Sequence, residues 1–127
     1  MCKAALLLMA IVAAPVQAIG LGAIEVRSYL NQPFDARIPI TAGRDESLAD
    51  LRVALAAQAQ FDKAGLQRTA ALMNLKFEIA RDGRRGFVHV TSQAAMREPA
   101  LDFLVEISGS RTRLVERYQV ALDPQRP

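Results

Sequence analysis

The sequence predicts a mainly β protein, a small antiparallel β-sandwich of the immunoglobulin-like type with one or two short helical turns near residues 61–74. Three observations support this fold class. Apolar and polar residues alternate in several short segments, turn residues separate these segments at regular spacing, and there is neither an internal repeat nor a strand–helix–strand rhythm. The length of 127 residues suits one domain. Alternation alone does not distinguish an immunoglobulin-like sandwich from a small barrel.

The first 18 residues have the pattern of a secretory signal peptide. Lys3 precedes an apolar run over residues 4–14, Pro15 ends the run, and Val16 and Ala18 are small residues at positions −3 and −1 of a cleavage site. We therefore predict a signal peptide over 1–18, one domain over 19–124 and a C-terminal tail over 125–127. Such a segment predicts export from the cytoplasm, and the family resemblance given below makes the periplasm the predicted location.

An uncleaved membrane anchor is the alternative for this segment. Residues 4–24 are nearly uncharged and reach the roughly 20 residues that a transmembrane helix needs, which would give an inner-membrane location. Pro15, Gly20 and Gly22 argue against one continuous helix there. A lipoprotein is disfavoured because Cys2 precedes the apolar run instead of following it.

Composition excludes several kinds of chemistry. Cleavage after Ala18 leaves no cysteine and one histidine, and lowers the net charge from +3 to +2 because Lys3 is lost. These counts exclude a disulfide framework, a multi-cysteine metal site and any site built on two histidines. A nucleic-acid partner would need a concentrated basic stripe with aromatic residues for stacking. We expect no cofactor, no metal and no nucleic acid.

The first part of the predicted domain contains two alternating segments. Residues 19–22 are expected to form a flexible start, residues 24–29 alternate, and residues 34–40 alternate with a buried row of Phe34, Ala36, Ile38 and Ile40. Pro39 has no N–H to donate, so it predicts an edge strand or a strand end.

Residues 48–58 are ambiguous between helix and strand. Ser47 and Asp50 have the spacing of a helix cap, and the alanines favour a helix. Leu51, Val53 and Leu55 instead alternate as a strand, which we predict over 51–56, partly on the family resemblance given below. Two short helical turns should follow. The first is capped by Asp62 and ended by Gly65, and the second is capped by Thr69.

Four further strands complete the prediction, over residues 75–80, 87–92, 101–108 and 114–122. In the third of these, Phe103 has the parity of the inward row and Asp102 that of the outward row. Asp102 and Glu106 do not form a catalytic pair, because four residues along a strand separate them by about 13 Å. His89, the only imidazole, shares a face with Phe87 and Thr91 and is expected to be structural or solvent-facing. We predict no catalytic residue.

Arginines gather at two predicted hairpin tips. If the last four strands run alternately up and down, both tips lie at one end of the sandwich and would create a local positive field there. The alternative is two ordinary solvated tips, with Asp82 beside the first. The candidate partner-binding residues are Arg81, Arg84, Arg85, Arg111 and Arg113.

Seven segments in order carry a family resemblance: LGAIEV at 21–26, LNQPFDA at 30–36, FDKAGL at 61–66, LKF at 75–77, VTS at 90–92, REPALDFLVE at 97–106 and the closing 114–124. Through these segments most of the predicted domain resembles the periplasmic N-terminal domain of FimV-like type IV pilus assembly proteins. The chain departs from the usual family pattern at Ile107 and Ser108, where Trp and Pro are typical.

This resemblance implies a non-catalytic periplasmic interaction module that supports assembly of the type IV pilus and its outer-membrane secretin. Its partners would be proteins of that machinery, with a membrane role only if the signal segment is uncleaved. The family's LysM peptidoglycan-binding module is expected to be absent from this chain. The alternative is an unrelated periplasmic β-sandwich that binds envelope proteins by β-augmentation, as chaperones do.

Overall fold

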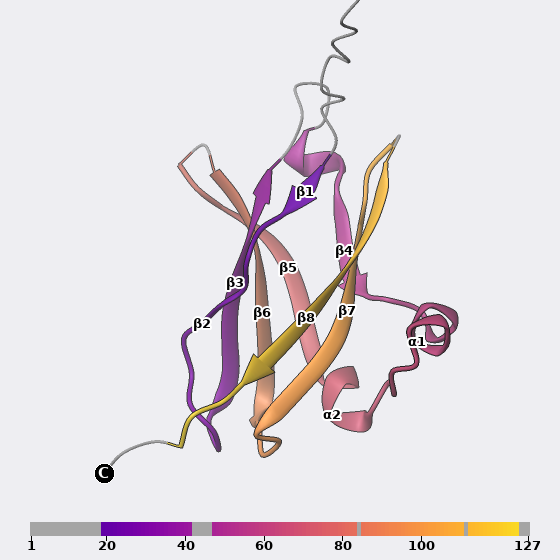
Figure 1. Ribbon diagram of the computed structural model, residues 1–127. Helices are drawn as coiled ribbons and strands as arrows, with labels where there is room; N and C mark the ends of the chain where they lie inside the picture. The colour runs from indigo at the N-terminus through magenta and orange to yellow at the C-terminus, as the bar shows by residue number, and fades with distance from the viewer. Residues whose placement is uncertain (1–18, 42–46, 84, 111, 125–127) are drawn as a thin grey trace, which may run out of the picture.

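The computed structural model describes residues 19–41, 47–83, 85–110 and 112–124, which form two antiparallel sheets packed face to face (Figure 1). The predicted mainly β sandwich is therefore confirmed. The elements are β1 (Gly20–Leu21), β2 (Glu25–Val26), β3 (Pro33–Thr41), the 3-10 turn η1 (Leu48–Asp50), β4 (Arg52–Leu55), α1 (Gln58–Ala64), α2 (Ala70–Met73), β5 (Leu75–Asp82), β6 (Arg85–Ala95), β7 (Ala100–Ser108) and β8 (Arg113–Ala121).

The larger sheet has the order β1-β3-β6-β5, with β2 also paired to β3. The predicted alternation of β3 is observed, because Phe34, Ala36, Ile38 and Ile40 are buried while the residues between them are more exposed. Their neighbours on β6 are equally regular. Ala36 lies opposite Val90 and Ile38 opposite Val88, so that apolar side chains of both strands face the other sheet.

Pro39 lies in an internal strand, so the prediction of an edge strand there is wrong. β3 has β6 on one side and the short strands β1 and β2 on the other. The carbonyl of Pro39 accepts a hydrogen bond from Gly22 N–H at 2.9 Å, so Pro39 faces the gap between β1 and β2. In an antiparallel strand the N–H and C=O of one residue point to the same side. The missing proline N–H therefore falls where the ladder is already interrupted.

The start of the domain belongs to the core, contrary to the predicted flexible segment. Ile19 is buried, and Gly20 and Leu21 pair with Thr41 and Ile40. The apolar side chains of Ile19 and Leu21 pack into the sandwich, and the glycines on either side of Leu21 hid this strand from a search for alternation.

A bulge interrupts the ladder between β3 and β6. The register shifts between Pro33, which lies opposite Ala95, and Asp35, which lies opposite Thr91. The hydroxyl of the buried Ser92 accepts a hydrogen bond from Phe34 N–H at 2.8 Å and donates one to the carbonyl of Ala94 at 2.7 Å. This side chain therefore satisfies backbone groups that the bulge leaves out of the ladder.

The smaller sheet has the order β4-β7-β8. Phe103 is completely buried, as predicted, and lies against Phe77 of the larger sheet and Tyr118 of β8, with ring centroids 6.4 Å and 6.1 Å away. Leu104 is also buried, although its parity places it on the outer row of β7. The outer face of this sheet is therefore partly covered, and α1 contacts β7.

Both alternatives for residues 48–58 are partly correct. Ser47 caps η1 by accepting a hydrogen bond from Ala49 N–H, and β4 follows at once. Two short helices come next, as predicted. Gly65 ends α1 with a positive φ of 71°, and the Thr69 hydroxyl caps α2. Asp62 does not cap α1, because the helix begins one turn earlier and Asp62 instead accepts a hydrogen bond from Gln58.

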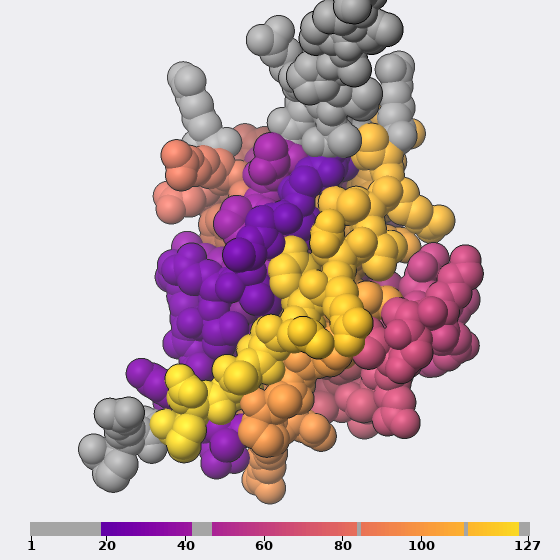
Figure 2. Space-filling view, viewed as in Figure 1, coloured from indigo at the N-terminus to yellow at the C-terminus, as the bar shows by residue number. Residues whose placement is uncertain are grey.

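The two lateral sides of the sandwich differ. On one side the Tyr118 hydroxyl donates to the carbonyl of Gly22 at 2.8 Å and Leu30 N–H donates to the carbonyl of Asp123 at 2.8 Å, joining the N-terminal segment to the C-terminal one (Figure 2). On the other side the edge strands are β4 and β5. Among the described residues no backbone hydrogen bond joins these two strands.

Candidate functional site

Two hairpin turns define one end of the sandwich. The first turn joins Asp82 to Arg85 and contains Gly83 at a positive φ of 66°. The second joins Ser108 to Arg113, where Gly109 N–H donates to the carbonyl of Thr112 at 2.8 Å. Figure 1 places both turns at the same end, at the top of the view and on the two sheets. We call this end, with Arg81, Arg85 and Arg113, the arginine end.

The described arginines of this end are exposed, and Arg84 and Arg111 lie outside the described residues. Arg113 is close to Glu106, with 3.5 Å between Nε and Oε1. Within the part of the chain that the structure describes, Arg81 and Arg85 form no ion pair. Both guanidinium groups lie in solvent, where exposed charges are well hydrated.

Leu48 closes the sandwich at the arginine end. It belongs to η1, which leads into the smaller sheet, and it packs on Gly86 of the larger sheet. A Cβ at position 86 would lie 2.7 Å from both Cδ atoms of Leu48, so glycine leaves the space that Leu48 occupies. This contact ties the first hairpin to the other sheet.

His89 is part of a polar ladder on the outer face of the larger sheet. Its Nε2 lies 2.8 Å from Oδ1 of Asp35, and its ring stands edge-on to Phe87 at 6.3 Å between centroids. The guanidinium of Arg37 lies over the Phe87 ring at 4.5 Å. In the described ranges no group of three or more His, Cys, Asp or Glu residues is placed to hold a metal ion. The expected structural or solvent-facing histidine matches this position.

The two outward carboxylates of β7 each face an arginine of β8. Asp102 accepts hydrogen bonds from Arg117 Nε at 2.9 Å and from Nη2 at 2.7 Å, whereas Glu106 faces Arg113. The hydrogen bonds from Arg117 hold the pKa of Asp102 below its usual value of 3.8. A depressed carboxyl pKa contributes stability above the unfolded pKa, and this contribution is lost as the pH falls through the folded pKa.

Tyr118 should titrate later than an ordinary tyrosine. Burial raises its pKa to about 12, and the negative charge of Glu116 adds to the shift. Because the folded pKa lies above the unfolded value of 10.0, the stability that neutral Tyr118 contributes is complete below pH 10 and is lost as the pH rises towards about 12.

We expect an ultraviolet titration of the tyrosines to show one phenolate forming near pH 12, a step that Tyr118→Phe removes. A titration curve left unchanged by this substitution would contradict the assignment.

Residues 19–125 match the family model described as "FimV N-terminal domain Ig-like domain". The chain belongs to this family. Membership in the FimV N-terminal domain family explains why the chain folds as an immunoglobulin-like sandwich and why the similar segments occur in the same order. The chain is 38% identical over 107 residues to "Motility hub protein FimV" of Pseudomonas aeruginosa, in strains PAO1 and UCBPP-PA14. No solved structure matches it.

The matched region is a small part of each relative. It covers 84% of this chain but 12% of the FimV proteins. Membership in the FimV N-terminal domain family therefore describes one module of such proteins. No helix in the described part of this chain is long and apolar enough to cross a membrane.

Sequence reasoning missed a groove beside α2. The sequence predicts Met73 only as part of the second helical turn and assigns no role to Arg68, yet both line an open groove between β4 and β5 with Leu55, Leu75 and Phe77. Met73 is 61% exposed and, together with the half-buried Leu55 and Phe77, forms a continuous apolar surface along the groove. No pattern in the sequence marks which residue of a four-residue helix faces solvent.

Proposed function

We propose that this chain is a non-catalytic periplasmic interaction module that supports assembly of the type IV pilus and its outer-membrane secretin. Membership in the FimV N-terminal domain family carries the proposal, since the named relative is a motility hub protein. A hub acts by holding other proteins, and a rigid sandwich with exposed hairpins is suited to that task. Because the chain belongs to this family, the alternative of an unrelated sandwich does not apply.

We further propose that residues 1–18 direct export and are removed before Ile19. Two observations support a boundary at this point. The family match begins at Ile19, and Ile19 is 4% exposed in the core, so the domain includes this residue. A periplasmic location follows from such export.

The arginine end is the proposed contact with an acidic protein surface of the pilus or secretin machinery. The proposed contact residues are Arg81, Arg84, Arg85, Arg111 and Arg113, and the exposure of Arg81, Arg85 and Arg113 beside the two hairpin turns supports this proposal. Exposed charges act mainly on the rate of encounter, and salt screens them beyond about 8 Å at physiological ionic strength. Contacts made through this end should therefore weaken as the salt concentration rises.

Deletion of the coding sequence in the native host, followed by complementation, tests this proposal. We expect deletion to reduce secretin multimers and surface pili, and the wild-type chain to restore both. A variant with Arg81→Gln, Arg85→Gln and Arg113→Gln should restore them poorly, because three exposed positive charges are lost from the arginine end. Secretin multimers and pili are measured by gel electrophoresis and electron microscopy. The intact mass of the complementing protein from the periplasm should correspond to a chain that begins at Ile19.

The matched control removes the same charge from elsewhere on the surface, with Arg27→Gln, Lys63→Gln and Arg97→Gln. All three control side chains are exposed and lie away from both hairpin turns. Full restoration by the arginine-end variant would exclude the arginine end as the contact. Unchanged multimers and pili after deletion would exclude the proposed function itself.

A further inference from the structure

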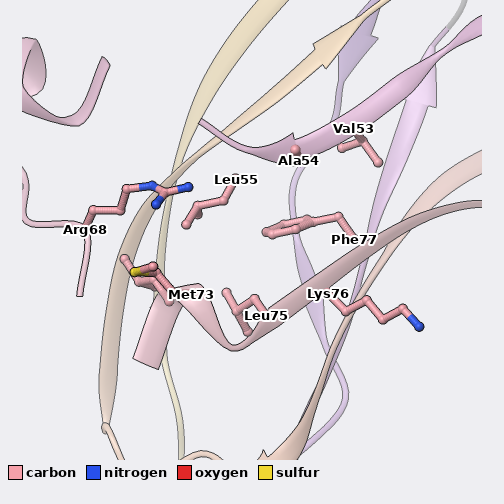
Figure 3. Close-up of a pocket in the computed structure, with 9 residues that line it drawn as sticks. Val53, Ala54, Leu55, Arg68, Met73, Leu75, Lys76 and Phe77 are labelled. Carbon is pink, nitrogen blue, oxygen red and sulfur yellow. The ribbon is translucent and has the colours of Figure 1, made fainter. Parts of the chain in front are cut away.

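The groove between β4 and β5 is the open lateral side of the sandwich. Figure 3 shows Val53 and Leu55 of β4 and Leu75 and Phe77 of β5 directed into the space between the two strands. The groove has a volume of about 390 Å³. Its base is the core itself, because Leu72 and Leu75 are almost completely buried, whereas Val53, Leu55 and Phe77 are only half-buried.

This groove exposes apolar surface that the fold covers on its other side. On that other side, the hydrogen bonds of Tyr118 and Leu30 join the N-terminal segment to the C-terminal one. On the β4–β5 side, α2 reaches the groove and presents Met73, whose flexible thioether side chain adapts to varied partners. The apolar rows of both sheets are therefore accessible along this side.

Arg68 supplies a positive charge at the rim. Its Nε donates to the carbonyl of Ala56 at 3.0 Å, which fixes the guanidinium beside Leu55 and Met73 (Figure 3). The two terminal nitrogens have no hydrogen-bond or ion-pair partner among the described side chains. Lys76 is the other charged residue of the lining, which contains no acidic side chain among the residues that the structure describes. A planar guanidinium held in this way is suited to a carboxylate, which it binds through two parallel hydrogen bonds.

The groove is bounded by strand edges on both sides. β5 ends the larger sheet and β4 ends the smaller one, so alternate N–H and C=O groups of each strand point outward without a ladder partner. An extended occupant can satisfy the groups of one of these two edges, because β4 and β5 approach each other too closely to admit a strand bonded to both. A helix cannot, because its backbone groups are bonded internally.

We propose that this groove binds an extended segment of a partner protein, with apolar side chains entering between β4 and β5 and one carboxylate paired with Arg68. Such recognition combines main-chain hydrogen bonds for affinity with pockets for alternate side chains. The site goes beyond the proposed arginine-end contact and is separate from it, since the groove is lined by the first residues of β5 and the hairpin turn follows its last. One module would then hold two partners, or two parts of one partner.

A displayed library of random nonapeptides, selected on the purified exported protein, tests the groove directly. We expect the enriched peptides to alternate apolar residues around one aspartate or glutamate. Arg68→Gln should weaken their binding roughly 10- to 100-fold, as expected for loss of a charge-assisted pair. Met73→Glu should weaken it at least as much by placing a negative charge beside the incoming carboxylate. Because Met73 is exposed, this second variant should fold normally.

Two controls separate this proposal from the arginine end. Arg97→Gln removes an equal charge outside the groove and should leave peptide binding unchanged. The triple arginine-end variant should also bind the peptides normally, so the groove and the proposed function fail independently. Enrichment of peptides without an acidic residue, no enrichment, or binding unaffected by both Arg68→Gln and Met73→Glu would overturn the proposal. Concentration-dependent dimerisation that Met73→Glu abolishes would identify a second copy as the occupant instead.

Discussion

Replacing Phe103 with alanine should lower the free energy of unfolding by about 3–5 kcal/mol. Phe103 is fully buried and lies between Phe77 of the larger sheet and Tyr118 of β8. Alanine would remove the contacts of the Phe103 ring with Phe77 and Tyr118 and leave a cavity that the surrounding strands fill only in part. Urea denaturation followed by circular dichroism measures the loss as a lower midpoint with an unchanged slope.

Asp102→Ala is the matched control for this prediction. Asp102 precedes Phe103 on β7 but faces outward, where it pairs with Arg117 in solvent. An exposed ion pair contributes little to stability, so this variant should lose only a small fraction of what Phe103→Ala loses. Equal losses in the two variants would show that β7 does not bury the row that contains Phe103.

Gly86→Ala should destabilise the fold by about 1 kcal/mol, the low end of the range for overpacking, because the atoms it meets are the end of the half-buried Leu48 side chain. The new Cβ would occupy space that the Leu48 side chain fills, at 2.7 Å from its Cδ atoms. Leu48 would have to move, and the contact between η1 and the larger sheet would open at the arginine end. Denaturation midpoints of the variant and the wild type measure the cost.

Leu48→Ala supplies the test of the mechanism. This substitution removes the atoms that the alanine at position 86 would meet, so the double variant should lose less stability than the two single losses added together. A double-mutant cycle gives this coupling directly. Strictly additive losses would show that the cost of Gly86→Ala comes from the backbone of β6 and not from Leu48.

The elements that the sequence predicts well are those whose two faces differ in polarity. In β3 and β7 a buried row alternates with an outward row, and the period of two reveals both the strand and its face. β1 shows no such contrast, because Gly20 and Gly22 flank Leu21. Its pairing depends on Ile40 and Thr41, which are about 20 positions away in the sequence. Local pattern carries no information about such a partner.

The position of Pro39 depends on the same kind of distant information. A proline reads as an edge signal when only its own missing N–H is considered. Pro39 is tolerated inside the sheet because it faces the gap between β1 and β2, where its carbonyl accepts a hydrogen bond from Gly22 N–H.

The two candidate sites also differ in how far the sequence could predict them. Up-and-down strand order was sufficient to place two hairpins at one end, but the groove arises from two edges of different sheets meeting in space.

The hydrogen bond from Tyr118 to Gly22 spans 96 positions of the chain and has a consequence for the order of folding. Leu30 likewise finds its acceptor in Asp123, so the earliest residues of the domain are held by the latest. A growing chain cannot make these contacts until β8 has been synthesised, and bringing together segments so far apart is intrinsically slow. The polypeptide therefore stays incompletely folded throughout its synthesis, which is the state that the export proposed above would require.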